Sequence, residues 1–321
     1  MQNNTKTIKQ PPLWPGKDLK SPLLSAFFAT EGRQVAGFYY FCGRKYNTPS
    51  MESKKILLIA QEMTPYTAEC AMSQIGHKLP VAVSEKGCDV RPFMPRWGSI
   101  NERRNQLHEV IRLSGMNIVI DDTDHPLIIK VASLQGTRMQ VYFIDSDDYF
   151  NKRLMTLGAS GEEYGDNMER AVFYARGVLE TVKKLRWVPD VIHCVGWMSA
   201  IVPLYVKTAY CDEPTCHDTK VVFTPYGKMP PSKPIEHFLE GVAFRSADKA
   251  LLESTGLDFS QPEALCQLGA LYCDGYVKSF KADNPELFEF AKAHGKAVLE
   301  LAPDAKIGEA YTDFYRQLCG K

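Results

Sequence analysis

The sequence has 321 residues, of which 45% are hydrophobic and 24% charged, which is enough apolar material for one large core or two small ones. Its 38 basic and 38 acidic residues leave no net charge, which argues against nucleic acid and against an anionic membrane as partners. The nine scattered cysteines favour a reducing compartment over a disulfide framework, so we expect a cytoplasmic protein.

Residues 1–50 lack a periodic hydrophobic pattern and contain several prolines and basic residues. We expect them to be a disordered arm or a non-native extension, and we expect residues 51–321 to form the folded domain. The longest apolar run near the start, residues 23–29, is too short to cross a bilayer and has no cleavage pattern behind it. We therefore predict neither a membrane span nor an export signal.

Alternating strand and helix signals begin at Lys55. Residues 56–60 form a fully apolar run that suits a buried parallel strand, residues 68–84 have a helical pattern, and residues 87–95 indicate a turn and a second strand. This order predicts an α/β fold with a doubly wound, mostly parallel sheet.

Residues 116–144 interrupt this alternation. Two apolar runs, at 117–120 and 127–131, flank a polar segment at 121–126, and this pattern predicts an inserted β-hairpin. The Asp and His residues of the polar segment could hold a metal, but the same residue types are ordinary in turns. A further strand is expected at 139–145.

The clearest helix is predicted from Asp166 to Arg186, because apolar residues recur there every three or four positions. Asp166 or Asn167 would be its N-cap. The remaining pattern predicts a strand at 191–194, a helix at 198–210, a strand at 221–224, and a C-terminal helical tail with helices at 284–294 and 308–318.

Five groups of motif residues follow one another along the folded part. They are AQEMTPY at 60–66, GCDVRPFMPRWG at 87–98, VYFID at 141–145 with YGDNMER at 164–170, PDVIHCVGW at 189–197, and VVFT at 221–224. In this order they resemble the amino-terminal half of bacterial glycogen synthases and plant starch synthases. The resemblance covers Lys55 to about Ser279.

For the fold, the resemblance implies a Rossmann-like domain similar to the N-terminal domain of a GT-B glucosyltransferase. In that family a carboxyl-terminal domain holds most of the donor nucleotide, and the residues after Asp274 are too few to form one. The last predicted helix faintly resembles the family's terminal helix. We therefore expect residues 51–321 to be a glycogen/starch synthase N-terminal-like domain without the donor domain.

For the function, the resemblance implies retaining transfer of glucose from ADP-glucose to an α-1,4-glucan, with no metal and no cofactor. The family places a lysine and two glycines against the nucleotide phosphates, and the corresponding positions here are Ala68, Cys70 and Ala71. Glycine allows a close backbone approach and the lysine balances charge, so this loss predicts impaired donor binding. Lys78 could substitute, but it falls on a different turn of the predicted helix.

The family's His-Asp-Trp-His segment is also altered, because Val195, Gly196 and Met198 surround Trp197 here. The family's Ile-His-Asn after the next strand corresponds to Pro225, Tyr226 and Gly227. Polar contacts to the transferred sugar are therefore expected to be missing.

Five residues remain as site candidates. Asp166 resembles the acid near the family's acceptor site and is the candidate catalytic residue, although it could equally be a helix cap. Asn167, His193, Trp197 and Tyr226 are candidate substrate-binding residues. His193 could instead cap the end of its strand, and Trp197 could be a sugar platform or part of the core.

The segment CDEPTCH at 211–217 contains soft metal ligands, but no second cysteine pair lies at zinc-finger spacing, so a polar surface loop is the alternative. A dinucleotide-binding domain would need G-x-G-x-x-G after the first strand, and this is absent. Three functions stay open: an ADP-glucose-dependent glucosyltransferase, a non-catalytic glucan-binding or regulatory module, and a half-enzyme whose partner chain supplies the donor domain. The expected ligands are α-glucan or ADP-glucose.

Overall fold

The computed structural model describes residues 53–120, 122–226, 238–279, 284–302 and 304–320. From Ser53 onward the chain forms one compact unit. The predicted arm at residues 1–50 lies outside the described residues, as do Asp121 of the predicted hairpin turn and Gly227 of the last motif.

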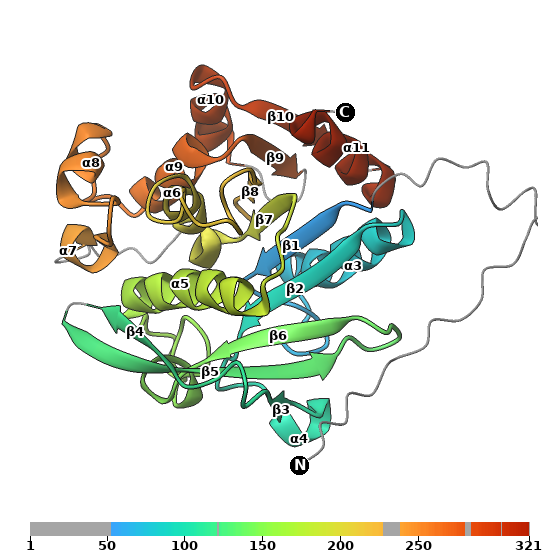
Figure 1. The fold of residues 1–321 in the computed structure, drawn as a ribbon, viewed down its shortest axis with the longest axis vertical. Helices are drawn as coiled ribbons and strands as arrows, with labels where there is room; N and C mark the ends of the chain where they lie inside the picture. The colour runs from blue at the N-terminus through green and yellow to red at the C-terminus, as the bar shows by residue number, and fades with distance from the viewer. Residues whose placement is uncertain (1–52, 121, 227–237, 280–283, 303, 321) are drawn as a thin grey trace, which may run out of the picture. The chain divides into compact units, whose positions relative to one another are not determined.

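The described residues form a ten-stranded sheet in the order β10-β9-β8-β7-β1-β2-β6-β5-β3, with β4 paired to β5 (Figure 1). The strands from β10 to β6 are parallel, and β5 runs antiparallel to β6, β3 and β4. This confirms the predicted, mostly parallel α/β sheet. The strands are β1 (Lys55–Ala60), β2 (Asp89–Pro95), β3 (His108–Glu109), β4 (Met116–Ile120), β5 (Thr123–Ser133), β6 (Gln140–Asp145), β7 (Val191–Val195), β8 (Lys220–Thr224), β9 (Gly275–Ser279) and β10 (Ala297–Leu301).

Helices cover both faces of this sheet, as a doubly wound fold requires. Helices α3 and α11 pack on each other over one face, and α5, α6 and α9 cover the other face (Figure 1). The helices are α3 (Ala71–Glu85), α4 (Glu102–Asn105), the π-helical turn η1 (Asp147–Asn151), α5 (Asn167–Leu185), the 3-10 turn η2 (Trp197–Ser199), α6 (Val202–Lys207), α7 (Phe238–Val242), α8 (Lys249–Ser254), α9 (Glu263–Tyr272), α10 (Pro285–Ala293) and α11 (Ile307–Cys319).

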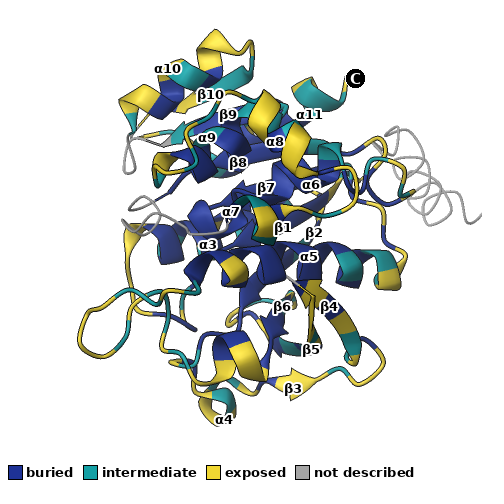
Figure 2. Cartoon of the chain, turned by 90° about the vertical axis from the view of Figure 1, so that its left-hand side faces the viewer, coloured by how far each residue is buried: buried dark blue, intermediate teal, exposed yellow. Residues whose placement is uncertain are grey.

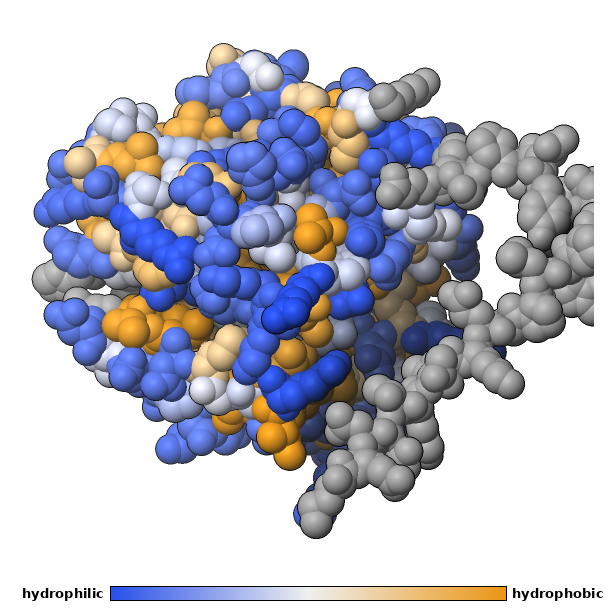
Figure 3. All heavy atoms as spheres, viewed as in Figure 1, coloured by the Kyte–Doolittle hydropathy of each residue, from blue (hydrophilic) through white to orange (hydrophobic). Residues whose placement is uncertain are grey.

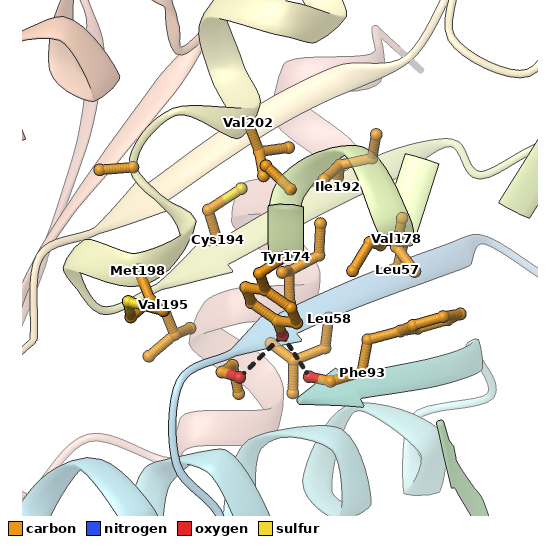
Figure 4. Packing of buried hydrophobic residues seen from close by; sticks show 14 of the residues in the cluster. Leu57, Leu58, Phe93, Tyr174, Val178, Ile192, Cys194, Val195, Met198 and Val202 are labelled. Carbon is orange, nitrogen blue, oxygen red and sulfur yellow. Dashed lines mark hydrogen bonds between the residues drawn. The ribbon is translucent and has the colours of Figure 1, made fainter. Parts of the chain in front are cut away.

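The central parallel strands are buried on both faces, in agreement with their continuous apolar runs (Figure 2). Tyr174 of α5 is fully buried, and its hydroxyl lies 2.9 Å from the carbonyl oxygen of Ala60 and 3.0 Å from that of Phe93 (Figure 4). It thereby joins α5 to the carboxyl ends of β1 and β2. On the surface shown in Figure 3, hydrophobic residues occur in small groups among hydrophilic ones.

Helix α3 begins at Ala71, three residues later than predicted, because of its capping. The backbone N–H of Ser73 donates to Cys70 Sγ at 3.3 Å, and the backbone N–H of Cys70 donates to Ser73 Oγ at 2.9 Å. This capping box satisfies free amides at the start of the helix. At Gly76 a Cβ atom would come 2.2 Å from the carbonyl oxygen of Glu62, so α3 packs directly on the loop that precedes it.

The helix predicted at 198–210 is shorter and broken, because η2 and α6 occupy only part of it. Pro203 lies in the first turn of α6 and has no N–H to donate to the preceding turn. At the other end, the hydroxyl of Thr208 donates to the carbonyl oxygen of Leu204 at 2.6 Å and closes the helix.

The inserted hairpin is confirmed, but the predicted turn at 121–126 is too long. Asp124, His125 and Pro126 belong to β5 and pair with Val119, Ile118 and Asn117 of β4. Asp122 takes the left-handed conformation, with φ +61°. The reversal is therefore short, because residues that are common in turns continue the strand here.

The C-terminal tail contains strands that the sequence pattern did not predict. The predicted helices at 284–294 and 308–318 are confirmed as α10 and α11. Between and before them, β9 and β10 extend the parallel sheet, with Ala297 opposite Gly275. The tail is thus part of the main sheet as well as helical.

Candidate functional site

The carboxyl ends of β8, β7, β1, β2 and β6 meet along one edge of the sheet. In open α/β sheets, ligands bind outside this edge. The loops that follow these strands carry most of the motif residues identified in the sequence, so this edge is the candidate site.

Gln61 ties three of these loops together and is only 3% exposed. Its backbone N–H donates to the carbonyl oxygen of Val195 at 3.1 Å, and its own carbonyl oxygen accepts from the Trp97 indole at 2.9 Å. Its side-chain oxygen accepts from the backbone N–H of Met198 at 3.3 Å. The loops after β1, β2 and β7 are therefore one connected unit.

Gly196 allows the loop after β7 to pack closely on the loop after β1, because it has no side chain. Its φ is +88°, and a Cβ atom there would lie 2.9 Å from Gln61 Oε1 and 3.0 Å from Gln61 Cβ. An aspartate, as the family motif has, would not fit this packing. The neighbouring Val195 and Met198 are buried, so these replacements belong to the core rather than to an open sugar-binding wall.

The loop between β1 and α3 is acidic where the family resemblance implies a cation. The thiol of Cys70 donates to Glu62 Oε2 at 3.2 Å, and Glu69 lies beside it on the exposed loop. Burial raises the pKa of Glu62, and the hydrogen bond from Cys70 opposes this effect. Residues 61–77 contain no Lys or Arg.

Lys78 does not replace the missing lysine in the structure. It is exposed on α3 and lines a cavity of about 520 Å³ whose other side is formed by residues 305–309. Lys78 comes two turns of α3 after the capping residue Cys70, which places it about 12 Å along the helix axis from the helix start.

Asp166 lies at the N-cap position of α5 but makes no side-chain capping bond. Its Oδ2 accepts instead from Arg153 Nη2 at 2.5 Å. Its Oδ1 is buried without a hydrogen-bond partner. The prediction that Asp166 or Asn167 is the N-cap is confirmed for the position of Asp166, but its carboxylate bonds to Arg153 rather than to the free amides of the first turn.

Arg170 lies fully buried one turn further along α5. Its guanidinium donates to the carbonyl oxygens of Tyr149 and Met155, both at 2.8 Å, and lies 5.1 Å from the centre of the Trp97 ring. Burial lowers the pKa of Arg170 to about 10, so it is charged at neutral pH. Its Nη2 has no partner, like Asp166 Oδ1.

Asn167 supports this arrangement and is 2% exposed. Its side-chain oxygen accepts from Arg170 Nη1 at 2.7 Å, and its amide donates to the carbonyl oxygen of Thr156 at 2.9 Å. Both ends of the side chain are thus used inside the protein. Asn167 holds Arg170 in place rather than facing a ligand.

His193 lies in the middle of β7 and has no exposed surface. Its Nδ1 lies 2.6 Å from the Tyr315 hydroxyl of α11, and its Nε2 lies 2.8 Å from the Thr224 hydroxyl of β8. Burial lowers the pKa of His193 to about 3. The prediction that it caps a strand end is wrong, and the structure gives it no surface for a ligand.

Trp197 and Tyr226 follow β7 and β8 but are only 5% and 4% exposed. The structure does not bring them into one open surface with Asp166. Their roles as sugar contacts stay predictions.

The sequence analysis missed a buried charge network at the ends of β2 and β6. Asp145 is 1% exposed, and its carboxylate accepts from Lys130 at 2.8 Å, with Arg96 Nε at 3.8 Å. Lys130 also donates to Glu102 at 2.7 Å. Burial raises the pKa of Asp145, and the hydrogen bond from Lys130 opposes this effect. Arg96 and Asp145 lie in the motifs found in the sequence and could have pointed to this network. Lys130 lies in the hairpin, outside those motifs, so its pairing with Asp145 had no sequence signal.

A second missed group joins the hairpin to α5. His125 Nδ1 lies 2.8 Å from Asp148 Oδ2, and its Nε2 lies 3.0 Å from the Tyr149 hydroxyl. That hydroxyl donates to Glu169 at 3.2 Å. The sequence analysis considered His125 as a metal ligand. In the structure it instead belongs to a series of hydrogen bonds that joins Asp148, Tyr149 and Glu169.

Within the described ranges, no three His, Cys, Asp or Glu side chains are grouped so as to hold a metal ion. In the segment 211–217, Cys216 is buried, while the His217 ring lies 3.0 Å from the carbonyl oxygen of Cys211. The same ranges contain no helix with the length and hydrophobicity of a transmembrane span.

Comparison with known families matches residues 55–277 to the starch synthase catalytic domain. The glycogen synthase of Chlorobium limicola is 31% identical over 232 residues, which are 70% of this chain and 47% of that protein. The glycogen synthase of Chlorobium chlorochromatii is 29% identical over 252 residues, which are 76% of this chain and 50% of that protein. The chain thus spans about half the length of the curated relatives it matches.

Among solved structures, the catalytic domain of starch synthase IV from Arabidopsis thaliana, bound to ADP and acarbose, has the same fold. The TM-score is 0.61 and the identity 16%, covering 78% of this chain and 51% of that chain. The chain belongs to the glycogen and starch synthase family.

Proposed function

We propose that this chain is a glycogen/starch synthase-like protein of α-1,4-glucan biosynthesis that alone transfers little or no glucose from ADP-glucose. The observation that carries this proposal is the β1–α3 loop, in which the Cys70 sulfur caps α3 and residues 61–77 contain no Lys or Arg. The family reaction would require a nucleotide diphosphate at this helix start.

The physical reason is charge. A helix start binds phosphate through free amides and a favourable dipole, and a neighbouring cation strengthens the site. Here the Ser73 amide already donates to the sulfur of Cys70, and no Lys or Arg lies within residues 61–77. A diphosphate would find no cation in this loop and would meet the Glu69 carboxylate, so its binding is disfavoured.

The start of α5 retains a partly exposed ion pair that a glucan could reach, because the Arg153 and Asp166 side chains are 28% and 20% exposed. Asp166 can accept a hydrogen bond and Arg153 can donate one. A sugar hydroxyl can do both at once. We therefore propose Asp166 as the residue that contacts glucan, with Arg170 and Asn167 as positioning residues. A cytoplasmic location stays a prediction from cysteine usage.

A second candidate function is a half-enzyme that works with a separate donor half. The support is that the matched relatives continue for about as long again as the region they share with this chain. The Arabidopsis starch synthase was solved with ADP and acarbose, so ADP-glucose and α-glucan are the ligands to test.

Release of ADP from ADP-glucose in the presence of glycogen tests both functions. The purified chain is assayed alone and mixed with the separately produced carboxyl-terminal half of the Chlorobium limicola enzyme. We expect no release above background from the chain alone, because losing even one charge-stabilising group costs about 10²–10³ in rate. Turnover by the chain alone would contradict the first proposal, and turnover only in the mixture would favour the half-enzyme.

A further inference from the structure

The two ends of the sheet differ in how well their outer strands are protected. At one end the outermost strand, β3, has only two residues, His108 and Glu109, and both are exposed. Beside it, the carbonyl oxygen of Val119 in β4 accepts a hydrogen bond from Arg176 of α5, which covers that edge. Soluble proteins use short, charged or covered edge strands to prevent a second chain from adding to a sheet. This end is therefore blocked.

The strand at the other end, β10, is longer and more apolar. Its sequence is AVLEL, with no proline or lysine, and Ala297, Val298 and Leu299 are half-buried. Within the described residues β10 pairs only with β9, and it is the last strand of the sheet (Figure 1). An apolar strand with one unpaired edge is a template for pairing with another chain.

The pairing of β10 with β9 shows which backbone groups lie on its outer edge. The N–H of Ala297 donates to the carbonyl oxygen of Asp274, just before β9, at 3.3 Å. Successive residues of a strand point their N–H and C=O groups to alternate sides, so the first, third and fifth residues of β10 face β9. The second and fourth, Val298 and Glu300, face outward, and within the described ranges no strand pairs with this edge.

The two faces of β10 carry different side chains. Gly275 of β9 lies beneath Phe314 of α11, because an added Cβ atom would come 2.8 Å from that ring. Leu299 lies on the same face, two positions after the residue opposite Gly275. On the other face, Lys278 donates to the Glu300 carboxylate at 3.1 Å. The one charge of β10 is therefore balanced within the chain.

We propose that β10 pairs in the antiparallel direction with β10 of a second copy of this chain, about a two-fold axis at Leu299. In this register Val298 of each copy lies opposite Glu300 of the other. Both outward residues then form hydrogen-bonded pairs, and each pair exchanges both of its N–H···O bonds. Leu299 lies opposite its own copy, so an apolar contact forms at the axis.

The neighbouring registers are less favourable. An axis at Glu300 would place two carboxylates directly opposite each other, and like charges in that position are destabilising. An axis at Val298 would place Glu300 opposite Lys296, whose N–H already donates to the carbonyl oxygen of Ala291 at 3.1 Å. The axis at Leu299 is therefore the register that pairs every outward backbone group of the strand.

A second copy is the partner that this edge fits, because the pairing is self-complementary and closes about a two-fold axis. The chain has no net charge, so two copies do not repel each other at long range. Antiparallel joining also points the carboxyl edges of the two sheets in opposite directions. The inference does not depend on the proposed function, since it involves neither glucan nor nucleotide.

Sedimentation of the full-length chain over a range of concentrations tests the association. We expect a reversible dimer with a dissociation constant of about 10 µM, as for a small interface. Val298→Pro removes an outward N–H from each copy and leaves the bonds to β9 intact, so the dissociation constant should rise at least about tenfold. The matched control is Val119→Pro, on the edge strand β4 at the blocked end, and it should leave the constant unchanged.

Disulfide trapping tests the register and does not depend on the proline variants. In Leu299→Cys the two thiols would face each other across a pair with Cα atoms about 4.5 Å apart, within the range of a disulfide. Oxidised glutathione should therefore cross-link this variant into dimers. Val298→Cys is the control, because it lies opposite Glu300, and it should cross-link no more than the wild-type chain.

Four results would each overturn the proposal. They are a wild-type chain that stays monomeric up to about 100 µM, unchanged association in Val298→Pro, weakened association in Val119→Pro, and equal cross-linking of the two cysteine variants. Circular dichroism establishes that each variant is folded. All measurements are made without ADP-glucose or glucan, so failure of the proposed function would not alter their outcome.

Discussion

The two groups of loops at the carboxyl edge of the sheet differ in how fully their polar atoms are paired. Around Gln61 and Gly196, the loops after β1 and β7 are closed on each other, and the helix start they lead to is capped by a thiol. At the start of α5, Asp166 Oδ1 and Arg170 Nη2 are buried and unpartnered. The start of α5 thus carries a partly exposed ion pair between Asp166 and Arg153, whereas the loops after β1 and β7 are packed against each other.

The largest expected effect tests how much the buried contacts of Arg170 at the start of α5 contribute to the free energy of unfolding. Arg170→Ala would remove bonds to the carbonyl oxygens of Tyr149 and Met155 and leave a cavity beside Trp97. We expect the free energy of unfolding to fall by about 4 kcal/mol, since removing a buried charged partner leaves other groups unsatisfied. Urea unfolding measures this, with Arg112→Ala as an exposed control. A loss below about 1 kcal/mol, the scale of a surface substitution, would contradict this account.

The second effect tests how closely the loop after β7 packs on the loop after β1. Gly196→Ala would place a Cβ atom 2.9 Å from Gln61 Oε1 at a φ of +88°. We expect a loss of about 3 kcal/mol from strain and overpacking together. Gly161→Ala is the matched control, because its φ is +84° but nothing lies within 4 Å of the added atom. That control isolates the backbone cost, about 1 kcal/mol. Equal losses in the two variants would show that the loops are not closely packed.

The third effect is a pH dependence that comes from His193 beneath the closed loops. Its pKa is lowered from 6.5 to about 3 by burial, so the unfolded chain binds a proton that the folded chain excludes. Stability therefore decreases as pH falls below about 6.5, and the loss between pH 7 and pH 5 should be about 2 kcal/mol. Unfolding of wild type and His193→Gln at both pH values measures the difference. If the variant shows the same decrease as wild type, His193 is not its source.

The smallest effect concerns the proposed contact between glucan and Asp166 at the start of α5. Asp166→Asn keeps the shape of the side chain but weakens its acceptor strength. We expect the maltoheptaose concentration that protects residues 160–170 from hydrogen exchange to rise about tenfold, or about 1.4 kcal/mol. Asp212→Asn, at an exposed position, is the control. Unchanged protection would remove Asp166 from the proposed glucan contacts.

Most of the sheet could be predicted because its central strands are apolar throughout. Residues 56–60 and 221–224 are short runs rich in β-branched and other apolar residues, which favour a buried strand over a helix, and the apolar residues of α5 recur with the period of a helix. Strands β9 and β10 were missed because they are short and carry Lys278 and Glu300, which weaken the apolar signal.

The candidate site was less predictable because its contacts join residues far apart in the chain. His193 was assigned a strand end, yet its partner Tyr315 lies 122 positions away. Asp166 matches an N-cap locally, but Arg153 takes its carboxylate. Local patterns indicate which residues can cap or bind, and only the fold decides which partner reaches them.

Calorimetric titration of the full-length chain with ADP at neutral pH tests the central claim most directly, because that claim is that the β1–α3 loop does not hold a nucleotide diphosphate. The account predicts no binding heat up to about 1 mM ADP, which corresponds to an affinity weaker than about 4 kcal/mol. A dissociation constant below about 1 mM that is lost when Glu62 and Cys70 are substituted would contradict it.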